Sequence, residues 1–353
     1  MSLSPVRVLL VDDSPVVLAI LRRMLSSSPE IEVVGTARNG REALGLIPRL
    51  QPAVVCTDLH MPDMDGIELT RQIMARYPRS ILVVSDYVQK EDTHNVFRLL
   101  EAGAMDIFPK PRGGLESDYN QMAQELIRKI KVLSGVVVFR RPGGKTPASS
   151  APSGICAGIK EPTCVRIVAI GASTGGPQAL QTILTQLPAD FPVPVICVQH
   201  ISDGFLQGLL DWLASQCKMK VVMAEPGELP SPGTVYFPQE KAHLEFDREG
   251  RFTSSLSPPF EGHCPSVTIT FKAVANFYGS AAVGVLLTGM GRDGAEGMQT
   301  ISQAGGITIA QDEDSCVVFG MPKQAIELGA ARYILDIREI VPMLLEKIFP
   351  KKR

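Results

Sequence analysis

The chain has 353 residues, of which 45% are hydrophobic, 20% are charged and 6% are aromatic, and its formal net charge at pH 7 is -2. This length suits two ordinary globular domains, and the apolar content is enough for a core in each. The near-zero net charge gives little support for a nucleic-acid partner, and no apolar run is long enough to span a membrane. The 7 cysteines are scattered without a CxxC pair, and no signal peptide opens the chain, so we expect a cytoplasmic protein with reduced thiols.

The first half alternates short apolar runs with segments of helical spacing, which predicts a doubly wound parallel sheet of flavodoxin type. The strands are expected at 6–11, 32–37, 53–57, 81–85 and 106–109. The helices are expected at 16–25, 41–50, 67–77, 92–102 and 119–133.

Five polar residues follow the ends of these strands. Asp12 and Asp13 close the first strand, Asp58 closes the third, Ser85 closes the fourth, and Lys110 lies just past the fifth. Because the carboxyl ends of parallel strands share one edge of the sheet, we expect these residues to gather there. Three carboxylates suit Mg2+, which takes oxygen ligands and would offset the charge of a phosphoryl group. We interpret Asp58 as a nucleophile toward phosphorus, with Lys110 and the Ser85 hydroxyl holding phosphoryl oxygens.

The alternative is a set of acidic loop residues tolerated at an exposed sheet edge. One Asp pair would favour that interpretation, whereas the complete set favours a site. Pro111, directly after Lys110, is expected to follow a cis peptide bond in a turn.

The composition changes over 135–163, which is rich in Pro, Gly and Ser and is interpreted as a flexible linker. We therefore expect domains at 1–134 and 164–353. The second half again alternates apolar runs with helical segments. Three short strands, at 234–238, 243–247 and 251–256, suggest an antiparallel or hairpin insertion in an otherwise parallel sheet.

A glycine-rich turn follows the first apolar run of the second half. The run begins at Val165 and stops at Gly171, and Ser173 follows just before Gly175 and Gly176. This pattern predicts a buried strand, a tight turn and the start of a helix. A serine there lies where open α/β sheets place their chemistry, with helix N–H groups available for an oxyanion. Taken alone, such a serine is more often part of a phosphate-binding or structural turn.

Two further polar residues end strand-like runs. His200 follows the run 193–199, and Asp293 follows the run 281–288 after a short glycine-rich segment. With Ser173 they offer a nucleophile, a base and an orienting carboxylate in the order Ser–His–Asp. Singly, the histidine could satisfy a backbone carbonyl and the aspartate a turn. Their shared position at strand ends favours a catalytic triad.

Three other interpretations of the second half compete with a catalytic triad. A general α/β-hydrolase has the order Ser–Asp–His, which differs from the order in this chain. A non-catalytic protein would use the second half as a protein-binding module, with Ser173 in a structural turn. Dinucleotide binding needs a GxGxxG spacing, which residues 171–176 lack.

The first half resembles a two-component receiver domain over essentially its full length. The residues that carry this resemblance are Asp12, Asp13, Asp58, Ser85 and Lys110. The resemblance implies that Asp58 is the phospho-acceptor and that Asp12 and Asp13 bind Mg2+ with it. It implies that Ser85 and Lys110 are the phosphoryl-switch residues. A chemotaxis-type histidine kinase is the implied phosphodonor.

The first half departs from the receiver pattern near that site. Ile107 occupies the aromatic switch position, and Asp86 follows the switch hydroxyl, where a small residue is common. Asp86 is expected to weaken the site by like-charge repulsion. His60, two residues after the acceptor, is interpreted as a solvated loop histidine.

The second half carries five distinctive stretches: GASTGGP at 171–177, VQHI at 198–201, PSV at 265–267, LLTGMGRDGA at 286–295 and QDEDSCVVFGMP at 311–322. In this order, behind a receiver-like half, they resemble chemotaxis-type protein-glutamate methylesterases over nearly all of 165–348. The implied fold class is α/β, with a flavodoxin-like receiver followed by a Rossmann-like domain that carries a small antiparallel hairpin. The implied activity is phosphorylation-controlled hydrolysis of glutamate γ-methyl esters, and deamidation of glutamines, on methyl-accepting chemoreceptors.

The resemblance also implies roles for single residues. Ser173 is the implied nucleophile, His200 the general base and acid, and Asp293 the carboxylate that orients His200. The backbone N–H groups near Thr174 and Met290 are expected to form an oxyanion hole. No cofactor is expected for the esterase, and a monomer is the default.

Further positions are interpreted as structural. His243 and His263 are assigned to a strand and a loop rather than to receptor contacts, and the acidic residues 312–314 to a solvated loop. Thr268 stands where the family often has an aspartate. The unphosphorylated receiver is expected to dock over the triad and to release it on phosphorylation, a switch that needs only a few kcal/mol, roughly.

Overall fold

The computed structural model describes residues 4–86, 90–111, 116–136 and 165–349. By its internal contacts the chain divides into two compact units, Met1–Pro147 and Ala148–Arg353, here called the N-terminal and C-terminal units. The predicted linker, 135–163, lies almost wholly outside the described residues, so the boundaries at 134 and 164 stay predictions.

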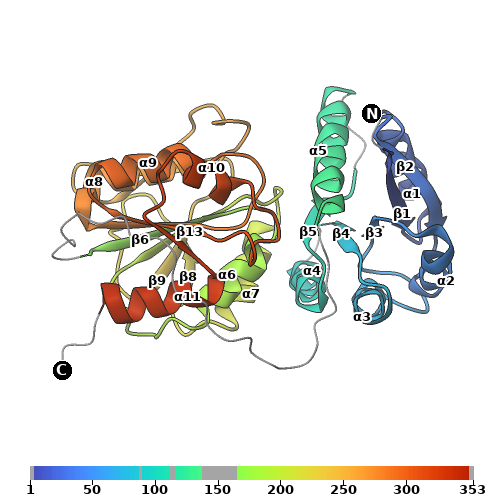
Figure 1. Cartoon of the computed structure of the whole chain (residues 1–353), viewed down its shortest axis with the longest axis horizontal. Helices are drawn as coiled ribbons and strands as arrows, with labels where there is room; N and C mark the ends of the chain where they lie inside the picture. Colours follow the sequence, from blue (N-terminus) through green and yellow to red (C-terminus); the bar gives the residue numbers. More distant parts are fainter. Residues whose placement is uncertain (1–3, 87–89, 112–115, 137–164, 350–353) are drawn as a thin grey trace. The chain divides into compact units, whose positions relative to one another are not determined.

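The N-terminal unit is built on a parallel sheet with the strand order β2-β1-β3-β4-β5, the predicted flavodoxin-type order. The strands are β1 (Val6–Val11), β2 (Ile31–Ala37), β3 (Val54–Thr57), β4 (Ser80–Ser85) and β5 (Asp106–Pro109). The helices are α1 (Pro15–Leu25), α2 (Gly40–Leu50), α3 (Gly66–Arg76), α4 (Lys90–Ala102) and α5 (Glu116–Ser134). Helices α1 and α5 cover one face, and α2, α3 and α4 cover the other (Figure 1).

The C-terminal unit contains a second parallel sheet, in the order β14-β13-β12-β6-β7-β9-β8. Its strands are β6 (Ile167–Ala172), β7 (Val195–Gln199), β8 (Lys220–Met223), β9 (Thr234–Phe237), β12 (Ala282–Leu286), β13 (Ile307–Gln311) and β14 (Tyr333–Leu335). The helices are α6 (Gly176–Leu184), α7 (Leu206–Ala214), α8 (Val267–Tyr278), α9 (Ala295–Gln303), α10 (Met321–Glu327) and α11 (Ile337–Pro342), with short helical turns η1 (Gly279–Ala281) and η2 (Met343–Ile348). Helices α8, α9 and α10 cover one face of the sheet, and α6, α7 and α11 cover the other (Figure 1).

The central strands of this sheet are apolar along their whole length because helices cover both faces. Every residue of β6, β7 and β12 is buried. Strand β6 lies between β12 and β7, so the chain proceeds from it in one direction through β7 and in the other through β12 and β13. Such a reversal of strand order opens a crevice at the carboxyl ends of the strands, where α/β proteins bind their ligands.

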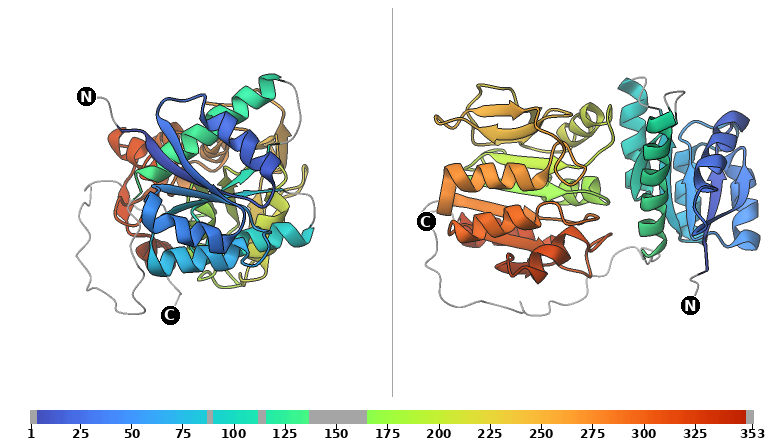
Figure 2. Two further views of the ribbon diagram at one scale, coloured as in Figure 1. Left: turned by 90° about the vertical axis from the view of Figure 1, so that its right-hand side faces the viewer. Right: turned by 90° about the horizontal axis from the view of Figure 1, so that it is seen from above.

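The predicted insertion is smaller than expected. Strands β10 (His243–Phe246) and β11 (Phe252–Ser255) form an antiparallel hairpin, drawn in gold beside the orange α8 in Figure 2. The expectation that 234–238 belongs to this insertion is wrong, because β9 pairs in parallel with β7 and β8. The four residues of β9 are all buried, which suits a strand inside the main sheet rather than a surface hairpin.

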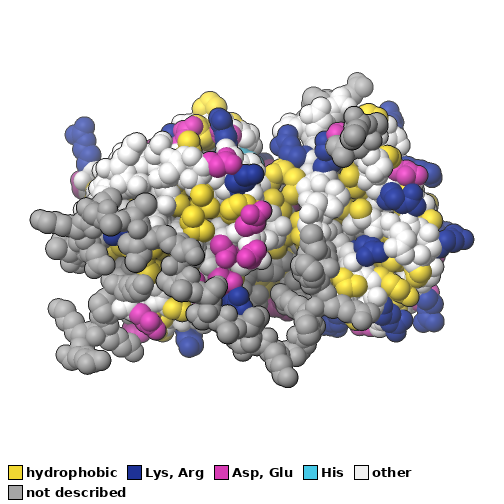
Figure 3. Space-filling model, viewed as in Figure 1, with side chains coloured by type: hydrophobic (Ala, Val, Ile, Leu, Met, Phe, Trp, Pro, Cys, Tyr) yellow, Lys and Arg dark blue, Asp and Glu magenta, His cyan; other side chains and the backbone are white. Residues whose placement is uncertain are grey.

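The apolar content of the helices and the charges on the surface agree with the composition. None of the described helices is long and apolar enough to cross a membrane. On the face drawn in Figure 3, Lys and Arg side chains of the described residues are dispersed among acidic and uncharged ones, without a broad basic band.

Candidate functional site

The N-terminal unit brings Lys110 against two of the three predicted carboxylates. Lys110 Nζ lies 2.9 Å from Asp12 Oδ2 and 2.8 Å from Asp58 Oδ2. Both aspartates are buried, with 1% and 4% of their surfaces exposed. The remaining oxygens are fixed by the backbone, since Asp12 Oδ1 accepts from Ser14 N–H and Asp58 Oδ1 from Leu59 N–H. The two carboxylates are therefore held rigidly at the ends of β1 and β3.

Asp13 completes an acidic cluster that suits a divalent cation. One ligand oxygen from each of Asp12, Asp13 and Asp58 lies within 4.8 Å of the others, and Asp13 is exposed. Burial raises the pKa of Asp58 to about 6, although the Lys110 ammonium acts in the opposite direction. Hard oxygen donors around a solvent-accessible point are the ligand set that Mg2+ prefers, because this ion keeps several waters. The residues present thus fit the metal that the sequence led us to expect.

The other predicted receiver residues lie in or just after neighbouring strands: Ser85 ends β4, Ile107 lies in β5, and His60 follows β3. Ser85 is 2% exposed, and its hydroxyl donates to the Asp86 carbonyl at 3.4 Å. Ile107 is buried in β5, so the predicted position of the aromatic switch holds an aliphatic core residue. His60 is exposed. Lys110 N–H donates to Ser85 O at 3.0 Å and so continues the pairing of β5 with β4.

The expected cis bond before Pro111 is wrong. Among the described residues the cis peptide bond is Cys264–Pro265, in the C-terminal unit. The trans form is the default for an X–Pro bond, and the Lys110–Pro111 pair carries no further signal for the cis form.

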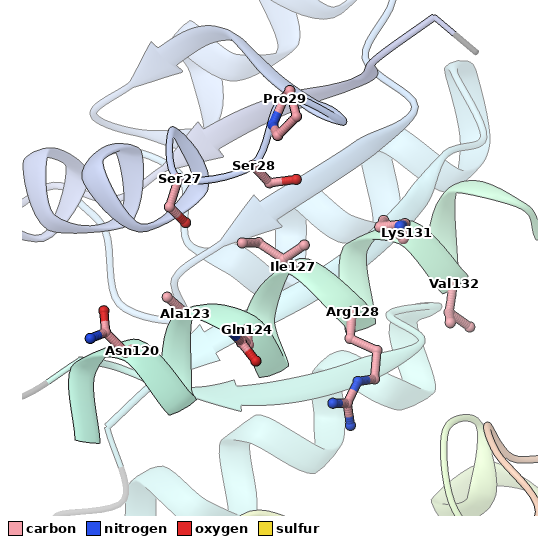
Figure 4. A pocket seen from close by; sticks show the side chains of 10 residues that line it. All are labelled: Ser27, Ser28, Pro29, Asn120, Ala123, Gln124, Ile127, Arg128, Lys131 and Val132. Atoms are coloured by element: carbon pink, nitrogen blue, oxygen red, sulfur yellow. The ribbon is translucent and has the colours of Figure 1, made fainter. Parts of the chain in front are cut away.

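A shallow groove of about 710 Å³ lies elsewhere on the N-terminal unit (Figure 4). It is lined by the turn Ser27–Pro29 before β2 and by residues of α5, among them Asn120, Arg128 and Lys131. The turn lies at the amino-terminal edge of the sheet, whereas Asp12, Asp58 and Ser85 follow the carboxyl ends of their strands. The groove is therefore separate from the acidic cluster.

In the C-terminal unit the three predicted triad residues follow three adjacent strands. Ser173 comes directly after β6 and His200 directly after β7, whereas Asp293 lies in the loop after β12. Backbone hydrogen bonds hold the first two turns together, because His200 N–H donates to Ala172 O at 3.0 Å. The strand order β12-β6-β7 thus brings these three residues to one edge of the sheet.

His200 and Asp293 form a hydrogen-bonded pair. His200 Nε2 lies 2.8 Å from Asp293 Oδ2, and the two side chains are 8% and 1% exposed. An ionised carboxylate only accepts, so this contact places the proton of a neutral imidazole on Nε2 and leaves the lone pair on Nδ1. His200 Nδ1 is buried and makes no hydrogen bond, and Ser173 Oγ makes none to it in this structure. Catalytic hydrogen bonds of this kind are often long before substrate binds.

The start of α8 holds the Asp293 carboxylate in place. Oδ1 accepts from Ser266 Oγ at 2.8 Å and from Thr268 N–H at 2.9 Å, and Oδ2 accepts from Val267 N–H at 2.8 Å. The N–H groups of Val267 and Thr268 belong to the first turn of α8, where backbone donors have no partner within the helix. This end of a helix favours negative charge. Burial would raise the pKa of Asp293, but the hydrogen bonds from His200 and Thr268 outweigh it and hold the pKa well below its usual range.

Thr268, where the family often has an aspartate, has a structural contact. Its hydroxyl oxygen accepts from Gly294 N–H at 2.6 Å, and its own N–H donates to Asp293. Thr268 therefore ties the loop that carries Asp293 to the helix that stabilises it.

Gln199 is a residue that the sequence argument did not single out. Its Nε2 donates to Ser173 O at 2.8 Å and to His200 O at 2.7 Å, so that one buried amide joins the two loops. A Cβ at Gly176 would lie 2.0 Å from Gln199 Oε1, so a glycine is needed there. The nearest signal in the sequence is the position of Gln199 in the VQHI stretch.

Thr288 supports the serine turn from the other side. Its carbonyl accepts from Ser173 N–H at 3.0 Å, and its hydroxyl donates to Thr174 O at 3.0 Å and accepts from Val318 N–H at 2.9 Å. Gly175 adopts φ 76° in this turn, where a Cβ would lie 2.6 Å from Val317 Cβ. Thr174 is buried and Met290 half-buried beside Gly289, and the oxyanion role of their N–H groups stays a prediction.

Two histidines assigned to structural roles lie close to the triad. His243 is fully buried, and its Nδ1 accepts from Ser266 N–H at 3.1 Å. The His263 ring stacks on the His200 ring, with 3.8 Å between centroids and 5° between planes. His263 therefore lies in a loop, as assigned, and in addition touches the predicted base, a contact that the sequence did not indicate.

The acidic stretch 312–314 follows β13 and supports the chain locally. Asp312 Oδ1 accepts from Ser315 N–H at 3.0 Å and from Ser315 Oγ. Ser315 in turn accepts from Gln311 Nε2, and Gln311 Oε1 accepts from Thr288 N–H at 2.8 Å. The stretch is thus part of the support for the serine turn.

Comparison with known proteins matches both halves of the chain. Residues 168–344 match the family model described as CheB methylesterase, and residues 8–116 match the response regulator receiver domain. The chain is 42% identical over 341 residues to "Protein-glutamate methylesterase/protein-glutamine glutaminase 2" of Methanospirillum hungatei, covering 96% of this chain and 97% of the relative. It is 40% identical over 340 residues to a protein-glutamate methylesterase/protein-glutamine glutaminase of Nitrosospira multiformis, covering 96% of each.

Among solved structures, the crystal structure of the Thermotoga maritima CheB methylesterase catalytic domain is similar to this chain. The identity is 40% and the TM-score is 0.51, over 52% of this chain and 99% of that one.

Proposed function

The chain belongs to the CheB methylesterase family, and from that premise we propose that Ser173, His200 and Asp293 hydrolyse glutamate γ-methyl esters on chemoreceptor helices under the control of its receiver domain. The curated relatives are named protein-glutamate methylesterase/protein-glutamine glutaminase, and this chain aligns with nearly their whole length. The observation that carries the residue assignment is the His200–Asp293 hydrogen bond. It joins the loops after β7 and β12, the two strands that flank β6, and Ser173 directly follows β6.

The first step is acylation of Ser173. His200 Nδ1, which holds the lone pair, takes the proton of the Ser173 hydroxyl while Oγ bonds to the ester carbonyl carbon. The imidazolium that forms donates through Nε2 to the Asp293 carboxylate, which stays ionised because its hydrogen bonds lower its pKa. Backbone N–H groups near Thr174 and Met290 stabilise the oxyanion.

The second half of the cycle returns the protons. The bond to the methoxy oxygen breaks, and that oxygen leaves as methanol with the proton from His200 Nδ1. A water molecule then gives its proton to the same nitrogen, attacks the acyl carbon and releases a glutamate carboxylate with Ser173 restored. With a glutamine substrate the leaving group is ammonia, so the same residues account for deamidation.

The acidic cluster of the N-terminal unit carries the control. Asp58 is the proposed phospho-acceptor, Asp12 and Asp13 hold Mg2+ with it, and Lys110 pairs with phosphoryl oxygens once Asp58 is modified. The bound ion supplies positive charge that stabilises the transferring phosphoryl group. Ser85 donates its hydroxyl to a phosphoryl oxygen in place of its 3.4 Å contact with Asp86 O. A chemotaxis-type histidine kinase is the proposed phosphodonor, and the cytoplasm the proposed compartment.

The decisive experiment measures methanol release from methylated chemoreceptor membranes. The native protein is compared with Ser173→Ala, each with and without acetyl phosphate and Mg2+. We expect release that requires Ser173 and that rises with acetyl phosphate. Absence of release from matched receptors would move the assignment to a protein-binding module, whereas release that ignores acetyl phosphate would remove only the switch.

Labelling by phenylmethylsulfonyl fluoride separates the enzyme from the binding module without any receptor. A base-activated Ser173 is expected to be sulfonylated, and Ser173→Ala is expected to abolish the label. Restraint by the receiver is tested by a chain that begins near Glu161. If its basal rate equals that of the unphosphorylated full chain, the N-terminal unit does not restrain the esterase.

A further inference from the structure

The rings of His200 and His263 stack face to face. Their ring centroids are 3.8 Å apart, and the planes differ by 5°. The stack covers one face of the His200 imidazole and leaves its edge free to bond. One edge atom, Nε2, is already committed to Asp293, while Nδ1 is buried and makes no hydrogen bond.

The position of His263 is set by contacts of its own segment. We call residues 256–263, between β11 and the cis bond at Cys264–Pro265, the strap. Phe260 and His263 exchange both backbone hydrogen bonds, at 3.0 and 2.9 Å, and Glu261 forms an ion pair with Arg292. These contacts do not involve the His263 ring, so the strap fixes the backbone from which that ring reaches His200.

A second tie fixes the earlier part of the strap. His243 Nε2 lies 3.3 Å from Pro258 O, and His243 Nδ1 accepts from Ser266 N–H. Ser266 also donates to Asp293 through its hydroxyl. The strap and the carboxylate that holds His200 are therefore anchored to the same helix start, and both act on one imidazole.

His200 needs such a second support. The terminal torsion of a histidine side chain is broad, and a single hydrogen bond at Nε2 still lets the ring rotate about the line to Asp293. Rotation of the ring plane moves Nδ1 away from Ser173 while the contact with Asp293 persists. A ring stacked at van der Waals distance opposes that rotation, because tilting the imidazole separates the two faces.

We propose that His263 is a positioning residue that fixes the plane of the His200 imidazole and so directs Nδ1 toward Ser173. The proposal deepens the proposed function, on which its kinetic readout rests. His263 takes no proton from the substrate. Loss of the stack lowers the fraction of enzyme in which the base is aligned and therefore lowers kcat, whereas KM for the receptor is unchanged.

The test compares His263→Ala with His263→Phe in the full-length protein. Alanine removes the stack, whereas phenylalanine keeps an aromatic face. Leu256→Ser is the matched control, because Leu256 lies on the same strap and is 85% exposed. We expect His263→Ala to lower kcat about 10- to 100-fold, the scale of a misplaced catalytic group, with KM within about twofold. His263→Phe should recover most of kcat, and Leu256→Ser should match the native protein.

Two further readouts do not depend on the receptor. The rate of Ser173 sulfonylation by phenylmethylsulfonyl fluoride should follow the same order as kcat. The His200 ring protons should show an upfield ring-current shift in NMR spectra, lost in His263→Ala and restored in His263→Phe. Thermal unfolding followed by Trp212 fluorescence shows whether each variant remains folded.

Several outcomes overturn the inference. It is wrong if the His200 ring signals do not move in His263→Ala, or if His263→Phe keeps the ring-current shift but is as slow as His263→Ala. A loss of kcat in Leu256→Ser equal to that in His263→Ala assigns the effect to the strap rather than to the ring. If the native protein releases no methanol, the proposed function fails, while the NMR and labelling readouts still decide the role of His263. If His263→Ala does not fold, His263→Phe tests the proposal by the same readouts. A variant that keeps the stack but does not keep kcat and the labelling rate near native values contradicts the proposal.

Discussion

His200 Nε2 lies 2.8 Å from Asp293 Oδ2, although 93 residues separate the two in the chain. The carboxylate in this pair accepts hydrogen bonds from two backbone N–H groups and one hydroxyl at the start of α8. Asp293 is therefore both the partner of the proposed base and the anion at the N-terminus of α8. Substitutions at Asp293 and its neighbours should affect catalysis and stability to different extents.

Asp293→Asn should lower the rate of methanol release by about 10⁴-fold, because an amide does not hold the Nε2–H tautomer of His200. The same change places an NH2 group against the donors of Ser266, Val267 and Thr268. We expect it to lower the free energy of unfolding by about 1–3 kcal/mol. Steady-state methanol release measures the first effect, and urea unfolding measures the second. A variant with the native rate would contradict the role of Asp293.

The pH dependence of stability should reveal the lowered pKa of Asp293. Below its unfolded pKa of about 3.9, the unfolded chain binds a proton that the folded chain does not. The stability that this carboxylate contributes is complete above about pH 4 and is lost as the pH falls toward the lower, folded pKa. The difference in unfolding free energy between the native chain and Asp293→Asn should therefore narrow on acidification from pH 6 to pH 3. Trp212 is the single tryptophan and is buried in the C-terminal unit, so its fluorescence reports this unit. A difference that stays constant over this range would contradict the prediction.

Thr268→Val should destabilise the C-terminal unit without removing any triad atom. The valine has nearly the shape of threonine but leaves Gly294 N–H buried without its 2.6 Å acceptor. The expected cost is about 1–3 kcal/mol, from the desolvation of an unpaired donor. Thr268→Ser keeps the hydroxyl and is the matched control. Equal stability of the two variants in urea unfolding would show that this hydrogen bond is not needed.

Much of the candidate site was predictable because it depends on strand ends. Alternating apolar runs located β1, β3, β6 and β7, and the residues that follow parallel strands share one edge of the sheet. Contacts between distant loops could not be predicted in this way. The amide of Gln199 joins two turns. The ring of His263 contacts His200, although His263 lies 63 positions further along the chain. No local pattern encodes such pairs.

The same limit explains the two errors. Strand β9 has the length and composition of a hairpin strand, but its partners β7 and β8 are set by the path of the whole chain. The cis bond before Pro111 was assigned from a lysine–proline pair, which does not by itself distinguish the cis form from the default trans form. The start of α8 was not predicted, although a serine directly before an apolar helical run is a typical N-cap.

Removal of Mg2+ should separate the switch from the esterase. Asp12, Asp13 and Asp58 offer the ligand oxygens, and Lys110 forms ion pairs with Asp12 and Asp58. We expect EDTA to abolish the stimulation of methanol release by acetyl phosphate and to leave the basal rate unchanged, since no residue of the triad belongs to this cluster. Asp58→Asn is the control, and it should show the basal rate with or without Mg2+. Stimulation that survives in EDTA would place phosphorylation at another site, and a fall in the basal rate would mean that the esterase itself depends on a metal.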